Sequence, residues 1–494
     1  MPAENDAPSY YSTATQLAAA LAARRVSSAE LVDRSIARIE MHDGKLNAVV
    51  VRDFERARKA ALEADKAIAR GEHRPLLGVP MTVKEAFNVA GLPTSWGLPG
   101  MQDLRAGVDT IAIARLKAAG AIVLGKTNVP FMLADWQTAN QIYGVTNNPW
   151  DLERTPGGSS GGGSAALAAG YVPLEFGTDL VGSLRVPAHF CGVFAHKPSG
   201  GLVPMRGFAP PGAPMLSVNA EADLVVIGPM ARSATDLALA LDVVAGPDDE
   251  QSVSYRLAMA PSRHANVKDF RVFIVDEHPM VPTSQAVRAA LQKVETNLAK
   301  AGCKIGRQSS LFPDLNHIAS NYGQLLGAFT GGNLPDPMFR ELEAKAAALS
   351  PDDLSPDSMN TRASVMSHHD WVAADRLRRG VAHQWRQFFA EWDVVLCPVT
   401  PTPAFSHDHR DPDARRISID GAEVHYWLQS MWAGPATLTG QPSTAMPIGL
   451  SDDGLPIGMQ IIGPYLEDRT TIGFAELVER EFGGFVAPRG YEKQ

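Results

Sequence analysis

The chain has little cysteine and no long apolar run. Its 494 residues include only three cysteines, Cys191, Cys303 and Cys397, which are widely spaced and odd in number. This pattern excludes a disulfide framework and the paired spacing of a zinc site. Because no run of about 18 apolar residues occurs, no membrane-spanning helix is predicted. The polar residues 1–6 contain no apolar signal-peptide core. We therefore expect a cytoplasmic protein without a membrane partner.

An excess of positive charge is also absent, since the net charge is −9. Nucleic-acid-binding domains carry a basic patch, so we expect no nucleic-acid partner. The content of 45% hydrophobic and 20% charged residues is that of an ordinary soluble enzyme. The length alone would allow several domains of about 150 residues each.

Glycine and serine are concentrated at residues 157–164, which read GGSSGGGS. The small apolar run AALAAG follows at 165–170, and GTDLVGS occupies 177–183. A glycine- and serine-rich cluster is often a flexible linker. The apolar helix formers directly after this one indicate instead the start of a buried helix. Glycines at such a turn let main-chain N–H groups approach a substrate closely, as an oxyanion hole requires.

Three residues are candidates for chemistry: Lys84, Ser159 and Ser183. A serine hydroxyl is a weak nucleophile until a base takes its proton. A lysine can be that base if burial keeps it neutral near pH 7 to 8. Lys84 ends the segment 79–83, whose apolar residues alternate as in a half-buried strand. A lone lysine or serine is more often an ordinary surface residue, and it is their combination that favours catalysis.

The sequence resembles the amidase signature family of serine hydrolases. The resemblance covers nearly the whole chain and is weakest over residues 250–430. The segments that carry it are 78–85 (GVPMTVKE), 155–162 (TPGGSSGG), 177–188 (GTDLVGSLRVPA), 191–200 and 440–460.

This resemblance implies a Ser–cisSer–Lys triad. Ser183 would be the acyl nucleophile, Ser159 would relay the proton, and Lys84 would be the neutral base. The two serines lie 24 residues apart, which is the usual spacing of the family. The peptide bond between Gly158 and Ser159 would be cis. The family needs no metal or cofactor, so none is expected.

The resemblance also implies one large α/β domain over residues 1–494, with a large mixed β-sheet core covered by helices on both faces. The oxyanion donors would be the main-chain N–H groups of Leu180, Val181, Gly182 and Ser183. The family usually has two glycines before the nucleophile, where this chain has Val181 and Gly182. Because the Cβ of Val181 restricts φ and adds bulk, we expect the loop to form with an altered acyl pocket.

In the family, the segment that matches residues 131–134 lies near the acyl pocket. Met132 and Leu133 are therefore predicted to line the substrate pocket. The alternative is that both are ordinary core residues.

Two other patterns point to different classes of protein. Residues 120–127 match the P-loop pattern G-x-x-x-x-G-K-[ST], but residues 121–124 (AIVL) indicate a buried strand instead of a phosphate-binding loop. We therefore reject a nucleotide hydrolase. His407, His409 and His425 fit no metal-ligand spacing, so loop or surface histidines are the better interpretation.

Amphipathic patterns predict packing helices within about residues 10–70, at 13–25, 28–42 and 54–70. Strands at 224–227 and 270–275 alternate with helices at 234–244 and 285–301, which is typical of a sheet covered on both faces. Residues 307–430 are rich in proline, glycine, histidine and aspartate. We interpret about 307–430 as a loop-rich region on the substrate side, with loops at 329–333 and 406–409.

The function predicted from these observations is hydrolysis of a small-molecule amide, ester or carbamate through an acyl-enzyme. The first alternative is a glutaminase-type subunit of an amidotransferase complex, which would need a partner subunit. The second is a binding protein without activity, a hypothesis motivated by Val181. A homodimer stays open, and so does the identity of the substrate.

Overall fold

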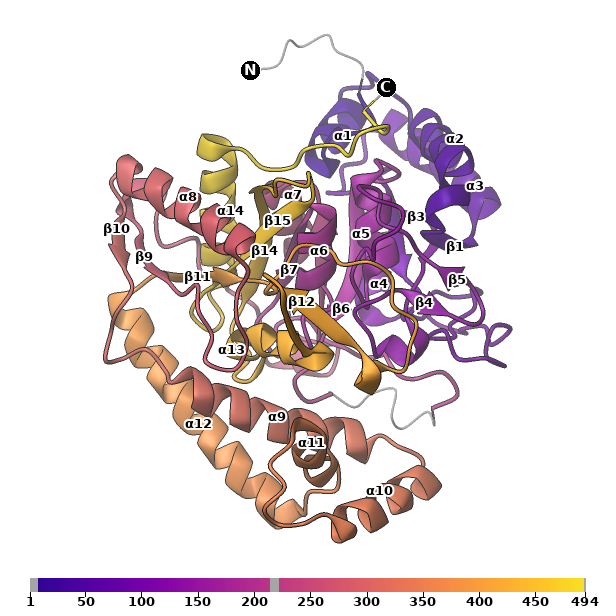
Figure 1. Ribbon diagram of the computed structural model, residues 1–494. Helices are drawn as coiled ribbons and strands as arrows, with labels where there is room; N and C mark the ends of the chain where they lie inside the picture. The colour runs from indigo at the N-terminus through magenta and orange to yellow at the C-terminus, as the bar shows by residue number, and fades with distance from the viewer. Residues whose placement is uncertain (1–7, 214–221, 493–494) are drawn as a thin grey trace.

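A single mixed β-sheet of 11 strands crosses the centre of the protein, here a computed structural model that describes residues 8–213 and 222–492 (Figure 1). Residues 1–6, on which the expectation about a signal peptide rests, lie outside these ranges. The strand order is β1-β3-β2-β6-β8-β7-β14-β15-β11-β9-β10. The strands are β1 (Val49–Arg52), β2 (Pro80–Lys84), β3 (Ile122–Thr127), β6 (Leu174–Asp179), β7 (Phe194–Lys197), β8 (Val226–Ala231), β9 (Arg271–Ile274), β10 (Lys304–Gly306), β11 (Val394–Pro398), β14 (Ser443–Leu450) and β15 (Pro456–Ile462).

The sheet mixes parallel and antiparallel pairs. Strand β2 is parallel to β3 and β6, and β9 is parallel to β10 and β11, whereas the other neighbours are antiparallel. Two short hairpins lie outside the sheet: β4 (Ala139–Asn140) with β5 (Gly144–Val145), and β12 (Arg416–Ile419) with β13 (Ala422–His425). Every residue of β3 is buried, so the P-loop-like residues 120–127 end in a strand of the sheet, as predicted.

Helices cover both faces of the sheet. The helices are α1 (Ala14–Ala22), α2 (Ser28–Leu46), α3 (Phe54–Ala69), α4 (Ile111–Ala118), α5 (Gly161–Ala168), α6 (Arg185–Cys191), α7 (Ala234–Val244), α8 (Gln285–Ala301), α9 (Leu315–Gly332), α10 (Asp336–Ala348), α11 (Pro356–Ser364), α12 (His368–Glu391), α13 (Gly434–Thr437) and α14 (Asp468–Phe482). Short 3-10 helices are η1 (Phe131–Leu133), η3 (Gln251–Val253), η4 (Val267–Asp269), η5 (Pro412–Ala414) and η6 (Tyr426–Ala433).

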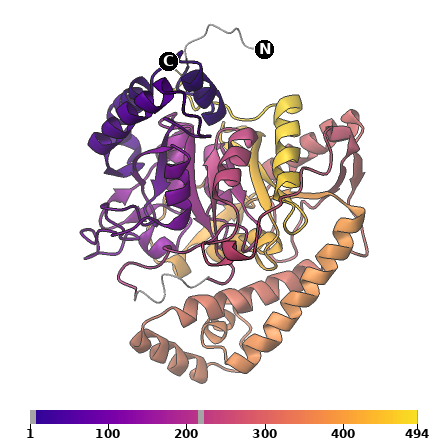
Figure 2. The ribbon, with the colours of Figure 1, turned by 180° about the vertical axis from the view of Figure 1, so that it is seen from behind.

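Two apolar clusters, one on each face, form most of the core. Helices α4, α7, α8 and α14 contribute to the first cluster, and α2, α3, α5 and α6 to the second. Strand β3 shows the alternation directly, since Val123 joins the first cluster while Ile122 and Leu124 join the second. Figure 1 shows α5 and α6 on the near side of the strands, and Figure 2 shows α7 and α14 from behind. The predicted fold class, a large mixed sheet covered on both faces, is confirmed.

The N-terminal part contains the three expected helices. Thr13 and Ser27 each begin a helix with a capping box, in which the cap hydroxyl and a side chain three residues later bond each other's backbone N–H. The prediction missed β1, which pairs with β3 at the edge of the sheet. Strand β1 has only four residues, too few to give a clear alternating pattern.

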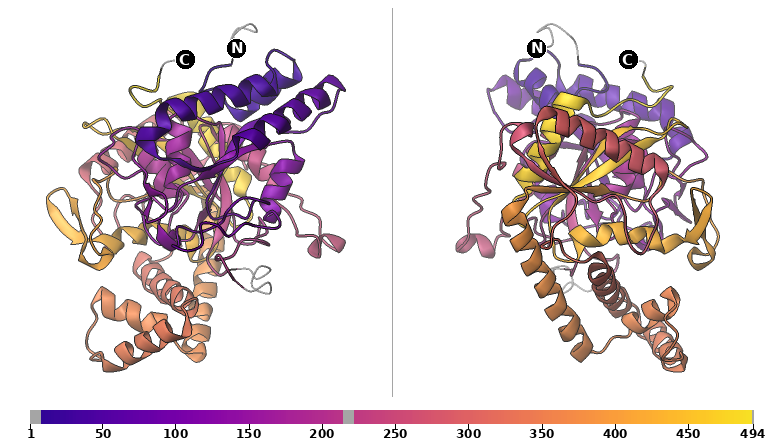
Figure 3. Two further views of the ribbon diagram at one scale, coloured as in Figure 1. Left: turned by 90° about the vertical axis from the view of Figure 1, so that its right-hand side faces the viewer. Right: turned by 60° about the vertical axis from the view of Figure 1, so that its left-hand side comes forward.

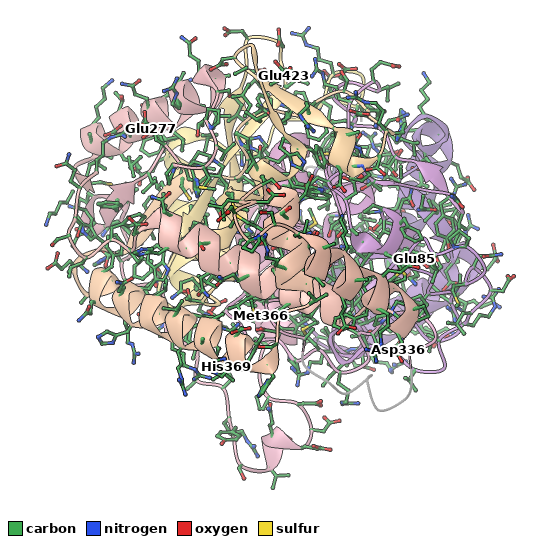
Figure 4. The ribbon with its side chains drawn as sticks, turned by 60° about the horizontal axis from the view of Figure 1, so that its bottom comes forward. Glu85, Glu277, Asp336, Met366, His369 and Glu423 are labelled. Atoms are coloured by element: carbon green, nitrogen blue, oxygen red, sulfur yellow. The ribbon has the colours of Figure 1, made fainter. Side chains whose placement is uncertain are left out.

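The prediction of a loop-rich region at 307–430 is wrong. Helices α9 to α12 occupy most of residues 315–391, and residues 329–332 belong to the end of α9. These helices lie together at the end of the molecule opposite α1 and α2 (Figures 1 and 3). Figure 4 views the face they cover, where Asp336 marks the start of α10 and His369 the start of α12.

The prediction of loops was based on the glycine and proline content of this region, but some of these residues lie within helices or at their first turn. Pro356 occupies the first turn of α11, where the missing N–H costs nothing. Within α9, a Cβ on Gly331 would overlap the backbone oxygen of Ser364 in α11, so glycine permits close helix packing there. Residues 406–409, by contrast, lie outside any helix or strand of more than one residue, as expected.

Within residues 8–213 and 222–492, no helix combines the length and the apolarity that crossing a membrane would require.

Candidate active site

Lys84, the predicted base, lies at the end of a strand that pairs in parallel with a neighbouring strand. Strand β2 ends at Lys84, and β6 lies beside it with Thr82 opposite Glu175. The Lys84 side chain is completely buried. Its ammonium nitrogen Nζ lies 2.6 Å from Ser159 Oγ and 2.7 Å from Thr178 Oγ1. The structure therefore brings Lys84 and Ser159 together, and it adds Thr178 as a second partner of the lysine.

Burial lowers the pKa of Lys84 from its ordinary value to about 7. Asp179 and Glu175 oppose this shift because a nearby negative charge favours the ammonium form. Burial is the larger effect, so Lys84 is divided between its neutral and charged forms near neutral pH. Burial also raises the pKa of Glu175 to about 8, although hydroxyl hydrogen bonds from Thr82 and Thr127 favour its charged form.

The glycine- and serine-rich cluster forms a tight turn and the start of α5, not a linker. The peptide bond between Gly158 and Ser159 is cis, as the resemblance implied. A Cβ on Gly158 would overlap the backbone oxygen of Asp135, and one on Gly163 would lie 2.5 Å from the Glu175 side chain. Both glycines are therefore needed for close approach between this turn and its neighbours.

Ser183 lies in a loop between β6 and α6 that one carboxylate organises. Asp179 Oδ1 accepts a hydrogen bond of 2.9 Å from the Gly182 N–H, and Oδ2 accepts one of 3.2 Å from the Leu184 N–H. Arg185 donates to both oxygens of Asp179, from Nη2 at 2.9 Å and from Nε at 3.0 Å. All of this is buried, and Ser183 itself is only 6% exposed.

The predicted oxyanion donors separate into two groups. The N–H of Gly182 donates to Asp179 Oδ1 and so holds the shape of the loop, and its role as an oxyanion donor stays an untested prediction. Among the described residues, the N–H groups of Leu180, Val181 and Ser183 have no acceptor. These three predicted donors are free to bond a substrate oxygen. The backbone of Val181 does not take up a left-handed conformation, whereas Gly182 does, with a φ of +87°.

Met132 and Leu133 lie in η1, partly buried and packed against the first apolar cluster. Both have a left-handed backbone, with φ values of 52° and 60°. The same segment continues to Asp135 and Trp136, which contact Gly158. It therefore passes the turn that carries Ser159, and a role of Met132 and Leu133 in binding substrate stays a prediction.

The structure also brings in residues that the sequence analysis missed. The Trp136 indole N–H donates to the Val181 carbonyl at 2.9 Å, and the Tyr322 hydroxyl donates to the Leu180 carbonyl at 3.3 Å. Tyr322 lies in α9, more than a hundred residues from the loop it contacts. No local pattern could have identified it, because its role depends on how α9 packs against the sheet.

His407, His409 and His425 were considered as metal ligands and set aside in the sequence analysis. The rings of His407 and His409 stack 5.6 Å apart, while His425 lies at the end of β13. In the part of the chain that the structure describes, no group of three or more histidine, cysteine, aspartate or glutamate side chains is arranged to hold a metal ion.

Two surface grooves lie away from the lysine and serine cluster. One of about 840 Å³ is formed by the loops after β9 and β10, and one of about 480 Å³ lies between α3 and β3. Their described lining does not include Lys84, Ser159 or Ser183.

The chain belongs to the amidase signature family of amide hydrolases, and it shares the fold of solved members of that family. Residues 30–472 match the family model described as Amidase. The predictions of the family and of amidase activity are thereby confirmed.

Individual relatives span nearly the whole chain. It is similar to an indoleacetamide hydrolase of Bradyrhizobium diazoefficiens, with 34% identity covering 98% of this chain and 89% of that protein. It is also similar to a glutamyl-tRNA(Gln) amidotransferase subunit of Roseiflexus castenholzii, with 32% identity covering 96% of both. Among solved structures, a bacterial aryl acylamidase of the amidase signature family superposes with a TM-score of 0.78 and 25% identity, covering 97% of both chains.

Proposed function

We propose that Ser183 is the nucleophile of this amidase, that Ser159 relays its proton, and that neutral Lys84 is the base. The observation that carries the proposal is the hydrogen bond of 2.6 Å between Lys84 and Ser159 at a fully buried lysine. A lysine with a pKa of about 7 can accept a proton at neutral pH, which an ordinary lysine cannot.

The proposed reaction has two halves. In the first, Ser183 Oγ attacks the carbonyl carbon, its proton passes through Ser159 to Lys84, and the C–N bond breaks as the leaving nitrogen takes a proton back through Ser159. In the second, water gives a proton to the same relay and attacks the acyl-enzyme, and Ser183 recovers its proton as the acid leaves. The N–H groups of Leu180, Val181 and Ser183 would stabilise the oxyanion in both halves.

The proposed substrate is a small-molecule amide, with esters and carbamates as further candidates of the same acyl chemistry. Support comes from relatives whose names include an indoleacetamide hydrolase and an aryl acylamidase. A cytoplasmic location and a homodimer stay predictions.

The test is product release from a panel that holds an aryl amide, an alkyl amide, glutamine, an ester and an aryl carbamate, with Ser183→Ala as the blank. We expect turnover of at least one amide, lost in Ser183→Ala and reduced about 10²–10⁴-fold in Lys84→Ala. A serine-reactive fluorophosphonate should label the parent and not Ser183→Ala. Turnover that survives in a folded Ser183→Ala protein would reject the assignment.

The second candidate is a glutaminase-type subunit of an amidotransferase. The observation that favours it is the match to a glutamyl-tRNA(Gln) amidotransferase component over 96% of both chains. It predicts glutamine hydrolysis without turnover of bulky amides, together with copurification of a partner subunit. Turnover of aryl amides by the isolated chain would favour the stand-alone hydrolase.

A further inference from the structure

Three backbone carbonyl groups of the loop that contains Ser183 accept hydrogen bonds from other parts of the protein. The Leu180 carbonyl accepts from the Tyr322 hydroxyl at 3.3 Å, and the Val181 carbonyl accepts from the Trp136 indole at 2.9 Å. The Ser183 carbonyl accepts from the Ser160 N–H at 3.2 Å. Each contact fixes the orientation of one peptide plane beside the nucleophile.

The peptide plane between Leu180 and Val181 matters most for the oxyanion. Among the described residues the only cis peptide bond is Gly158–Ser159, so this one is trans. In a trans peptide the C=O and the N–H point in opposite directions. A carbonyl turned toward Tyr322 therefore turns the Val181 N–H away from Tyr322. That N–H has no acceptor within the described chain and is free for a substrate oxygen.

Tyr322 is well placed to hold this orientation. Its side chain is completely buried in α9, in the third apolar cluster together with Ile318 and Leu325. Glycine at position 434 leaves room for the ring, since a Cβ there would lie 3.1 Å from it. The ring is therefore fixed by packing, and the hydroxyl is its one polar contact with the loop.

We propose that Tyr322 is a positioning residue that directs the Val181 N–H toward the oxyanion, and that α9 thereby supports catalysis from outside the sheet. The inference rests on the proposed function. It also explains how a chain with valine at position 181 forms a working loop: the valine peptide is oriented by a hydroxyl donated from another helix.

Tyr322→Phe tests the proposal because it removes the hydroxyl and keeps the ring. Losing an oxyanion donor outright costs about 10²–10³-fold in kcat, so loosening one is expected to cost roughly 10-fold or more, with KM little changed. The matched control is Tyr171→Phe. Tyr171 is also a buried tyrosine, its hydroxyl has no hydrogen-bond partner, and it belongs to the second apolar cluster. We expect it to leave kcat unchanged.

A trifluoromethyl ketone gives a second readout, because its adduct with a serine carries the oxyanion. Its affinity should fall in Tyr322→Phe by about the same factor as kcat. Equal affinity and equal kcat in a folded Tyr322→Phe protein would overturn the role of Tyr322, and so would a rise in KM alone. Failure of the ketone to react at Ser183 in the parent enzyme would instead reject the proposed nucleophile.

Discussion

The protonation state of Lys84 should set the pH dependence of the enzyme. Burial lowers its pKa to about 7, and only the neutral amine can accept a proton. We therefore expect kcat/KM to rise with pH through about 7 and to level off toward pH 9. The measurement is a pH profile with one amide substrate and with protein shown to stay folded at each pH. A flat profile between pH 5 and 9 would contradict the assignment of Lys84 as the base.

At this scale the sequence was enough to propose the reacting groups, but it did not identify the side chains that surround them. Lys84, Ser159 and Ser183 lie in motifs that can be recognised from the order and spacing of residues along the chain. The engagement of the Gly182 N–H by Asp179 could not be predicted, because it depends on the backbone path of the loop. Tyr322 could not be predicted either, because nothing near it in the sequence resembles a site.

The loop between β6 and α6 depends on a buried ion pair, and breaking that pair should destabilise the protein. Burial alone would raise the pKa of Asp179, but the Arg185 guanidinium outweighs burial and holds this pKa below its usual value. Asp179→Asn leaves the Arg185 charge buried and unpaired, which costs about 3–5 kcal/mol in comparable cases. We expect a drop of that size in the free energy of unfolding, measured by urea denaturation, together with a loss of activity.

The control is an exposed pair of a carboxylate and a basic side chain. Glu63 and Lys66 on α3 lie 2.8 Å apart with side chains 70% and 64% exposed. Exposed pairs contribute little, so Glu63→Gln should unfold at the same urea concentration as the parent. If Asp179→Asn also unfolds there, the buried pair does not stabilise the loop.

The packing of α9 against α11 can be tested with two glycine substitutions. In α9, Gly331→Ala would drive a methyl group into the backbone of Ser364, and overpacking of this kind costs about 1–3 kcal/mol. In α12, Gly380→Ala meets no atom within 4 Å on an exposed helical position. It should stabilise by about 0.4–1 kcal/mol. Thermal unfolding measures both, and equal shifts of the two variants would contradict this packing.

Helices α9 to α12 are the part of the fold that could not be predicted from the sequence. Regular alternation marked β2, and apolar residues at helical spacing marked α2 and α8. In residues 307–430, glycine and proline content was interpreted as loop. A glycine that allows close packing of two helices cannot be told apart in the sequence from a glycine in a loop turn. Only the packing partner in the structure distinguishes them.

At the scale of the whole molecule, the three cysteines should report global unfolding. All are free and buried, and burial raises the pKa of Cys191 and of Cys397 to about 12. Because only the thiolate reacts readily, a thiol reagent such as DTNB should titrate none of them quickly in the native protein and all three in denaturant. Rapid labelling of the native enzyme would show that a cysteine is more accessible than in this structure.

Hydrogen bonds join the first and last described segments of the chain. The Tyr11 hydroxyl donates to the Tyr491 carbonyl at 2.8 Å, and Arg38 donates to the same carbonyl at 2.6 Å. These two described segments lie at the end of the molecule opposite α9 to α12 (Figure 1). A support or fusion partner attached at either end would therefore leave α9 to α12 facing the solution. Residues 8 and 492 could also be joined by a short linker, with new ends opened elsewhere on the surface.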